Sequence, residues 1–463
     1  MQVLSIVERF FLASHDAGLG LGATFVIGVP GRLDRARVVE AWDILSQRYP
    51  ILRSLLARRS WRRDGWSGFA WKERFDRKIE PRFEPSSPRY VRSAPLHEVL
   101  DAELERLGNE PHDLDREPPV QLVVVEHGDL GTGLVIRIHH AALDGIALAV
   151  LSQDLAEILD AMARGERPSR EQLRIAPRGM ARCFTAVGLR GLGAAWLAHA
   201  RVARWNRPPR HDALPVAWSE RGVTTFGVKR VLPAATLDAI RAAGRRQRIS
   251  VNDVVLAAVA RACVDFAARR DVRLRKVTLS VPMNLRAYLR LDPRESIANQ
   301  GVAVEIHVPA STVDSRDELL GAIRAQTVPL KATPLPLITL ARTMMIFALP
   351  YSWVVASLRR VLAMRRAPGT TPTLTVSNVG PIWQRPEGGS VDRIGALPIV
   401  YLRHLYQCGY PMPATLALYT YRNEVQMEMS FAAGGLARSE AEGFLGLVKR
   451  QLFELLAIED PDG

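Results

Sequence analysis

Two adjacent histidines, His139 and His140, stand three residues before an Asp-Gly pair, Asp144 and Gly145. The ordinary pKa of histidine is close to neutrality, so a ring in a cleft can take a proton from an attacking hydroxyl or amine and later return it. The pair ends an apolar run typical of a strand, in which neighbouring side chains point to opposite faces. We therefore expect only one ring to occupy a cleft, and we predict that His140 is a general base.

Asp144 has two interpretations, as a carboxylate that orients His140 or as a structural anion that holds the turn. We favour the structural role. A buried aspartate needs a cation, because an unpaired buried charge is costly, and Arg286 at the end of the segment 281–286 is the candidate partner. Gly145 is expected to provide backbone room where the turn meets the following helix.

The histidine pair could instead be buried for structure or form half of a metal site. No cluster of His, Asp or Glu at ligand spacing follows it, so we predict no metal. A nucleophile motif is also missing: there is no Gly-x-Ser-x-Gly, and Cys183, Cys263 and Cys408 are far from the pair and from each other. A base without its own nucleophile indicates direct transfer between two bound substrates, with no covalent enzyme intermediate.

Hydrophobic periodicity indicates the elements that position these residues. Apolar runs at 120–126 and 134–140, joined by a Gly-rich turn, predict a hairpin that ends at the histidine pair, and 146–162 predicts the helix that follows. A helix over 33–49 begins at Asp34 as its N-cap. Later segments predict strands at 226–232, 276–283, 302–308, 373–376, 414–420 and 426–431, and helices at 236–246, from Ser250 to 266, and at 439–456. Asn252 and Asp253 are expected to be structural, as part of the helix cap.

A chain of 463 residues that is 48% hydrophobic exceeds what one core usually holds, so two lobes are expected. We place the N-terminal lobe at 1–170, a basic amphipathic linker with an embedded helix at 171–215, and the C-terminal lobe at 216–463, with a crossover segment near 370–400.

The net charge of +14 is concentrated in two segments without acidic residues, 172–211 and 319–386. Each contains eight basic residues, and the remaining 46 nearly balance the 48 acidic ones. Both segments are also rich in large apolar residues, which suits a membrane surface better than nucleic acid. Peripheral membrane contact through 172–211 and 335–366 and core helices with solvated arginine edges are equally good interpretations. No secretory signal is recognisable, so we expect a cytoplasmic protein, with peripheral attachment to the inner membrane surface as an option.

The motif residues His139, His140, Asp144 and Gly145 match every fixed position of the HHxxxDG acyltransferase superfamily, which the chain resembles. This superfamily includes condensation domains, polyketide-associated acyltransferases and bacterial wax ester synthase/diacylglycerol acyltransferases. Segments 251–257, 281–286 and 377–381 look like further motifs of the wax ester synthases, in the same order. Their Pro-Leu-Trp motif is not recognisable, and Asn-Val-Gly-Pro stands where they often have Asn-Val-Pro-Gly-Pro.

The resemblance implies an α/β (α+β) chloramphenicol acetyltransferase-like fold, with two pseudo-symmetric lobes and a tunnel between them. It implies His140 as the general base, Asp144 and Arg286 as a structural ion pair, and Ser377 and Asn378 as residues near the tunnel. No tightly bound cofactor is implied, and the acyl donor is a phosphopantetheine thioester on coenzyme A or on an acyl carrier protein.

We accordingly expect an acyltransferase whose acceptor is a hydroxyl of a lipid or secondary metabolite. The first alternative is a stand-alone condensation enzyme that forms an amide with an amine acceptor. The second is a non-catalytic module that binds acyl groups or carrier proteins.

Overall fold

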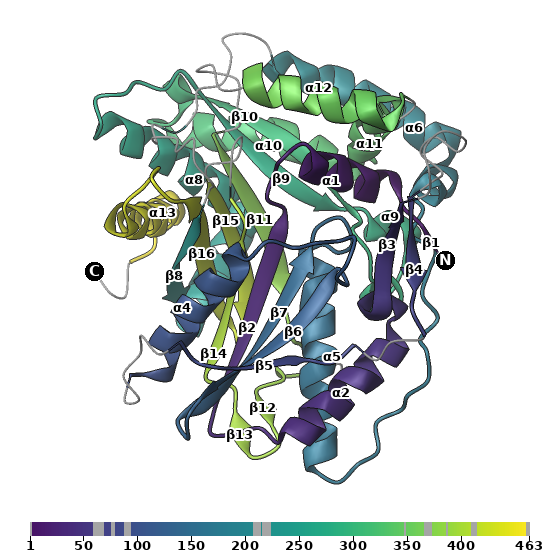
Figure 1. Cartoon of the computed structure of the whole chain (residues 1–463). Coiled ribbons are helices and arrows are strands. Elements are labelled where there is room, and N and C mark those ends of the chain that lie inside the picture. The colour runs from purple at the N-terminus through teal and green to yellow at the C-terminus, as the bar shows by residue number, and fades with distance from the viewer. Residues whose placement is uncertain are drawn as a thin grey trace.

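The computed structural model describes residues 2–58, 69–75, 79–87, 94–206, 214, 224–346, 349–364, 373–385, 388–408 and 414–459 (Figure 1). Over this part of the chain, buried side chains form two large apolar clusters, one for each of two lobes. Each lobe is a sheet flanked by helices. The α/β fold class and the two-lobe architecture are therefore confirmed.

The sheet of the first lobe has five strands in the order β14-β2-β7-β6-β5. Helix α4 packs its leucines on one face, and helices α2 and α5 cover the other, so the two central strands are buried on both sides. The bounds are β2 (Gly22–Pro30), β5 (Arg82–Pro85), β6 (Val120–His127), β7 (Gly131–His139), β14 (Tyr401–Tyr406), α2 (Arg35–Arg48), α4 (Leu96–Asn109) and α5 (Gly145–Ala163).

The sheet of the second lobe has six strands in the order β10-β9-β11-β15-β16-β8. Its apolar cluster joins the strands to four helices that are packed against them. The bounds are β8 (Thr225–Leu232), β9 (Lys276–Asn284), β10 (Gly301–Pro309), β11 (Leu374–Pro381), β15 (Ala414–Tyr421), β16 (Glu424–Ala432), α7 (Ala234–Gln247), α8 (Val251–Ala268), α10 (Arg316–Ala332) and α13 (Arg438–Leu456).

The smaller elements lie around these two sheets. Helix α6, inside the predicted linker, is broken at Gly188, whose φ of 67° favours glycine. The bounds are β1 (Gln2–Val3), β3 (Ser54–Arg58), β4 (Phe69–Glu73), β12 (Arg393–Ile394), β13 (Leu397–Pro398), α1 (Ile6–Asp16), α6 (Ala181–Ala203), α9 (Arg286–Leu289), α11 (Pro336–Ile346) and α12 (Tyr351–Met364), with 3-10 turns at Pro50–Arg53, Arg204–Asn206, Pro293–Glu295 and Ala310–Thr312.

Most predicted elements are confirmed. The hairpin is β6 and β7, although β7 ends at His139, one residue earlier than predicted. Asp34 caps α2 by accepting from the N–H of Ala36, and Ser250 caps α8 by accepting from the N–H of Asp253. Elements β2, β14, α1, α4 and α10 were not predicted from the sequence. No single described helix is long and apolar enough to cross a membrane.

One strand from the C-terminal half of the chain lies in the sheet of the first lobe. After β11 the chain crosses to the first lobe, where β14 pairs with β2 and brings Tyr401 opposite Gly28, before β15 returns to the second sheet (Figure 1). The side chains of Trp383 and Ile399 accordingly belong to the core of the first lobe. The crossover therefore extends to Tyr406, beyond the segment near 370–400, and the predicted boundary at 216 does not separate the lobes by sequence alone.

Candidate active site

A cavity of about 370 Å³ lies where the two lobes meet, within the size range of small-molecule sites. The turn between β7 and α5 contributes His140, Asp144 and Gly145 to its wall. Strands β9, β10 and β11 of the second lobe form the opposite wall, and α1 and α11 add apolar side chains. The histidine motif thus faces a space that both lobes enclose.

His140 lines this cavity in one defined tautomer. Its Nδ1 lies 3.0 Å from the carbonyl oxygen of Leu143, which can only accept, so Nδ1 carries the proton. The lone pair is then on Nε2, on the other side of the ring. Tyr406 stacks on this ring with 5.7 Å between centroids, and the ring of Phe11 lies 5.5 Å away. Burial lowers the pKa of His140, so the ring is neutral at pH 7 and can accept a proton.

His139 points elsewhere, as strand alternation requires. Its Nδ1 accepts from the N–H of Ala141 at 3.0 Å, and its Nε2 lies 3.2 Å from Nδ1 of His15. Burial, together with the neighbouring histidines, holds the pKa of His139 well below its ordinary value. His139 is therefore a neutral, hydrogen-bonded ring of the core that holds the turn in position.

Asp144 and Arg286 form a buried bidentate ion pair between the lobes. Nη1 and Nη2 of Arg286 lie 2.7 and 3.0 Å from the two carboxylate oxygens of Asp144. The carboxylate also accepts from the N–H groups of Ala147 and Gln300, each at 2.9 Å. Burial acts to raise the pKa of Asp144, but Arg286 and the two N–H groups outweigh it, so the pKa lies below its ordinary value. Because Nδ1 of His140 bonds to Leu143, Asp144 does not orient the ring.

The carbonyl groups of the motif turn have partners that the sequence did not indicate. Nδ2 of Asn299 donates to the carbonyl of His140 at 2.6 Å. Arg178, which is almost fully buried, donates to the carbonyl of Ala142 and pairs with the buried carboxylate of Glu8. In the sequence, Arg178 is one of the eight basic residues of the segment 172–211, and nothing distinguishes it from the others. In the structure, Arg178 holds the turn that carries His140.

Gly145 provides room for the ring that stacks on His140. A Cβ atom at this position would lie 2.7 Å from Oη of Tyr406, closer than side chains tolerate. Burial raises the pKa of Tyr406, so its hydroxyl stays protonated and uncharged. Any side chain at 145 would push Tyr406 toward His140 or out of its position.

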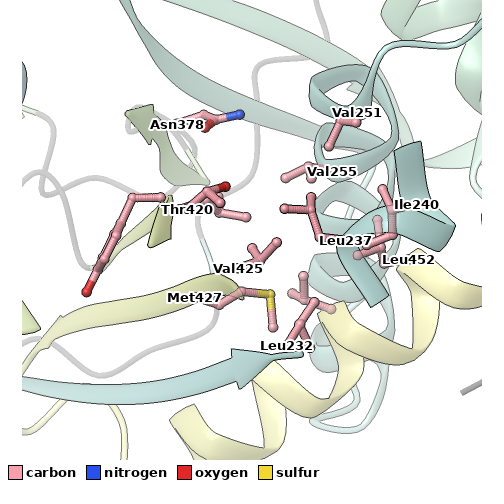
Figure 2. A pocket seen from close by; sticks show the side chains of 13 residues that line it. Leu232, Leu237, Ile240, Val251, Val255, Asn378, Thr420, Val425, Met427 and Leu452 are labelled. Carbon is pink, nitrogen blue, oxygen red and sulfur yellow. The ribbon is translucent and has the colours of Figure 1, made fainter. Parts of the chain in front are cut away.

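The two predicted tunnel residues lie in different places. Ser377 lines the cavity with His140, but Asn378, the next residue of β11, does not. Asn378 lies at the edge of a separate, largely apolar pocket of about 50 Å³ between β15, β16, α7 and α8 (Figure 2). That pocket is too small for a substrate. The expectation for Asn378 is corrected, because consecutive strand residues face opposite sides.

Asn252 and Asp253 lie in the first turn of α8 and do not line the cavity. Ser250 is the N-cap, and the carboxylate of Asp253 binds Nζ of Lys331 at 2.9 Å. These positions agree with the expectation that both residues belong to the start of the helix. Over the described part of the chain, no group of three His, Cys, Asp or Glu residues could hold a metal ion.

Charged groups are scarce in the cavity wall. Asp144 is paired with Arg286, and His140 is neutral; the remaining lining side chains are apolar or carry hydroxyl or amide groups. Hydroxyl groups come from the second-lobe strands, on Ser280, Thr375 and Ser377. A bound molecule would therefore meet hydrogen-bonding groups on the side of the second-lobe strands, and on the other side the apolar side chains of α1 with Leu340 and two threonines of α11.

The chain is similar in sequence to condensation domains over its first third. The family model of the condensation domain matches residues 9–174, which include the histidine motif. A curated relative, the AMB antimetabolite synthetase AmbE of Pseudomonas aeruginosa, is 24% identical over 265 residues. The match covers 53% of this chain but only 11% of that much longer protein.

Two solved structures share the fold over the whole chain. The first condensation domain of the calcium-dependent antibiotic synthetase, in complex with a substrate analogue, has a TM-score of 0.66 at 14% identity, covering 99% of this chain and 97% of that one. SgcC5 from Streptomyces globisporus, in complex with (R)-(-)-1-(2-naphthyl)-1,2-ethanediol and sucrose, has a TM-score of 0.64 at 15% identity, covering 98% of each. The predicted resemblance to the HHxxxDG superfamily is confirmed, and the chain has the fold of condensation domains.

Proposed function

We propose, from the condensation-domain fold and the intact histidine motif, that this chain transfers an acyl group from a thioester to a nucleophile, with His140 as general base. The observation that carries the proposal is the ring of His140 in the cavity between the lobes, neutral and with its Nδ1 proton held by the carbonyl of Leu143. This arrangement leaves Nε2 as the group that can accept a proton.

The reaction needs no covalent enzyme intermediate. As the acceptor attacks the thioester carbonyl, its proton passes to Nε2 of His140, and a bond forms between the acyl carbon and the nitrogen or oxygen of the acceptor. The bond between carbon and sulfur then breaks, and the thiolate recovers the proton from the imidazolium. Asp144, Arg286, Asn299 and Arg178 act through the turn that holds the ring, and are positioning residues.

An amine acceptor, and hence amide formation, is the leading proposal. It is supported by the condensation-domain match over the motif and by the similarity to the antibiotic synthetase domain. The preference for a hydroxyl acceptor that we derived from the sequence is not supported by the condensation-domain match. The hydroxyl acceptor stays as the second candidate for one reason, the diol bound to SgcC5.

The acyl donor in this proposal is carried on phosphopantetheine. A carrier domain is the first candidate for that carrier, because this chain matches only 11% of AmbE and nearly all of one condensation domain of the antibiotic synthetase. Coenzyme A, which ends in the same thiol arm, is the alternative. The proposal includes no tightly bound cofactor.

The test is transfer from acyl-pantetheine thioesters to acceptors offered as matched amine and alcohol pairs, with products identified by intact mass. We expect amide products, and a loss of about 10²–10⁴-fold in rate for His140→Ala. His97→Ala, which removes an exposed histidine of α4, is the matched control and should keep full activity. Full activity of His140→Ala would overturn the assigned base. Binding of thioesters without any transfer would favour the non-catalytic module.

A further inference from the structure

Large apolar side chains are exposed mainly on one group of helices. Of sixteen such side chains in the described part of the chain, nine belong to α1, α6, α11, α12 and the turn between the last two. These helices lie together along one side of the molecule (Figure 1). We call these nine side chains the apolar helical face: Phe10, Leu189, Trp196, Leu197, Met344, Met345, Ile346, Leu349 and Trp353.

The exposed side of α6 carries large apolar side chains beside its arginines. Leu189, Trp196 and Leu197 follow one another at helical spacing, and Leu189 is 89% exposed. The buried side of the same helix carries small residues such as Ala195 and Ala198. Other large apolar side chains of the helix, such as Phe184 and Leu192, pack inward, yet these three face solvent.

The charged side chains of α6, α11 and α12 have one sign. Helices α6, α11 and α12 lie in the two segments without acidic residues, and they expose Arg190, Arg201, Arg342, Arg359 and Arg360. Exposed tryptophans and aliphatic side chains beside arginines are the composition of a surface that enters the boundary between lipid headgroups and acyl chains. The positive charge specifies anionic headgroups.

Two of these helices, α1 and α11, also line the cavity. On α11, Leu340 and Thr343 face the cavity and Met344 and Met345 are exposed; on α1, Phe11 faces the cavity while Phe10 both lines it and is partly exposed. The apolar helical face is thus continuous with the apolar wall of the site that contains His140. A lipophilic molecule leaving a bilayer at this face would pass mainly along apolar side chains of α1 and α11, with Thr339 and Thr343 as the polar groups of α11.

We infer that the apolar helical face docks on a membrane surface that contains anionic lipids, and that one substrate of the cavity carries an apolar chain taken from that surface. The inference about the substrate rests on the proposed acyl transfer; the inference about membrane docking does not. The composition also offers a surface to an acidic protein partner. We favour the membrane because nine large apolar side chains, two of them tryptophans, exceed what charge recognition needs.

The experiment is flotation of the full chain with vesicles of phosphatidylcholine alone and of phosphatidylcholine with phosphatidylglycerol. We expect binding to the anionic vesicles and little to the neutral ones. The double variant Leu197→Glu with Trp353→Glu should weaken binding by about tenfold or more, since it removes two inserted side chains and adds repulsion. The matched control, Leu130→Glu with Phe75→Glu, replaces an exposed leucine and aromatic residue outside the face and should bind like the wild type.

Three outcomes would overturn the docking: no binding to anionic vesicles, equal loss in both double variants, or binding of an acidic protein partner without any binding of vesicles. Acyl transfer between soluble short-chain substrates separates the two proposals. The docking variant should keep this activity, because Leu197 and Trp353 do not line the cavity. His140→Ala should lose the activity and still bind vesicles. If the vesicle-bound enzyme transferred short acyl chains faster than long ones, the inference that one substrate carries an apolar chain from the membrane would be overturned.

Discussion

Removal of either partner of the ion pair between the lobes should destabilise the protein strongly. In Asp144→Ala the guanidinium of Arg286, 2% exposed, keeps the carbonyls of Ser296 and Ala298 as partners but loses its only counter-charge. An uncompensated buried charge costs about 3–5 kcal/mol. The same change removes the cap of α5, which adds about 1 kcal/mol. We therefore expect the free energy of unfolding to fall by about 4–6 kcal/mol.

Arg286→Met should cost less. It leaves the carboxylate of Asp144 with the N–H groups of Ala147 and Gln300, so part of its stabilisation and the cap survive. In the double variant Asp144→Ala with Arg286→Met no unpaired charge remains, and the loss should be smaller than the sum of the two single losses. Arg170→Met, which breaks a half-exposed pair with Glu40, is the control and should cost less than about 1 kcal/mol.

The measurement is urea denaturation at pH 7.5, followed by tryptophan fluorescence and far-ultraviolet circular dichroism. The two probes report tertiary packing and helix content separately, which matters because the pair joins two lobes. Losses below about 1 kcal/mol for both single variants, or a double variant that is strictly additive, would refute the argument that Asp144 and Arg286 stabilise each other as buried charges.

Three further predictions concern the site. Because the pKa of His140 is lowered by burial and the protonated ring is inactive, the acidic limb of log kcat/KM against pH should lie below the ordinary value of 6.5; a limb above 6.5 would contradict the assignment. Gly145→Ala should reduce kcat by about 10–100-fold through the clash with Oη of Tyr406, and adding Tyr406→Phe should restore part of the rate; no rescue would mean that the clash is not the cause. Ser377→Leu should reduce kcat/KM by about tenfold or more by filling the cavity, whereas Asn378→Leu should change it little; in steady-state assays, an equal loss in both variants or no loss for Ser377→Leu would contradict the placement of Ser377 alone in the cavity wall.

The motif and the strand before it could be predicted from the sequence, because each is recognisable from residues that are close together in the chain. The spacing from His139 to Gly145 and the strand before it define a turn that can hold only one ring in a cleft. Arg286 could be named because a buried aspartate needs a cation, and it lies opposite Asp144. Both features depend only on the chemistry of single residues and on the two-residue alternation of a strand.

Residues that bind backbone carbonyls left no such signal. Asn299 and Arg178 donate to the carbonyls of His140 and Ala142, and a carbonyl looks the same beside every residue of the sequence. Ser377 and Asn378 were equivalent in the sequence, since alternation states that one of them faces the cavity but not which. Strand β14 was missed because Arg403 and His404 break its apolar pattern; Nδ1 of His404 lies 3.2 Å from the buried carboxylate of Glu428 in the other sheet.

The position of β14 has a consequence for biosynthesis. The outer edge of strand β2, which is nine residues long and almost entirely buried, pairs with residues 401–406, so this edge stays unpaired during synthesis until Tyr406 has left the ribosome. An isolated fragment of residues 1–170 would present this edge unpaired, as a template for other chains. Such a fragment should therefore precipitate, and adding a tethered copy of the segment 396–408 should keep it in solution.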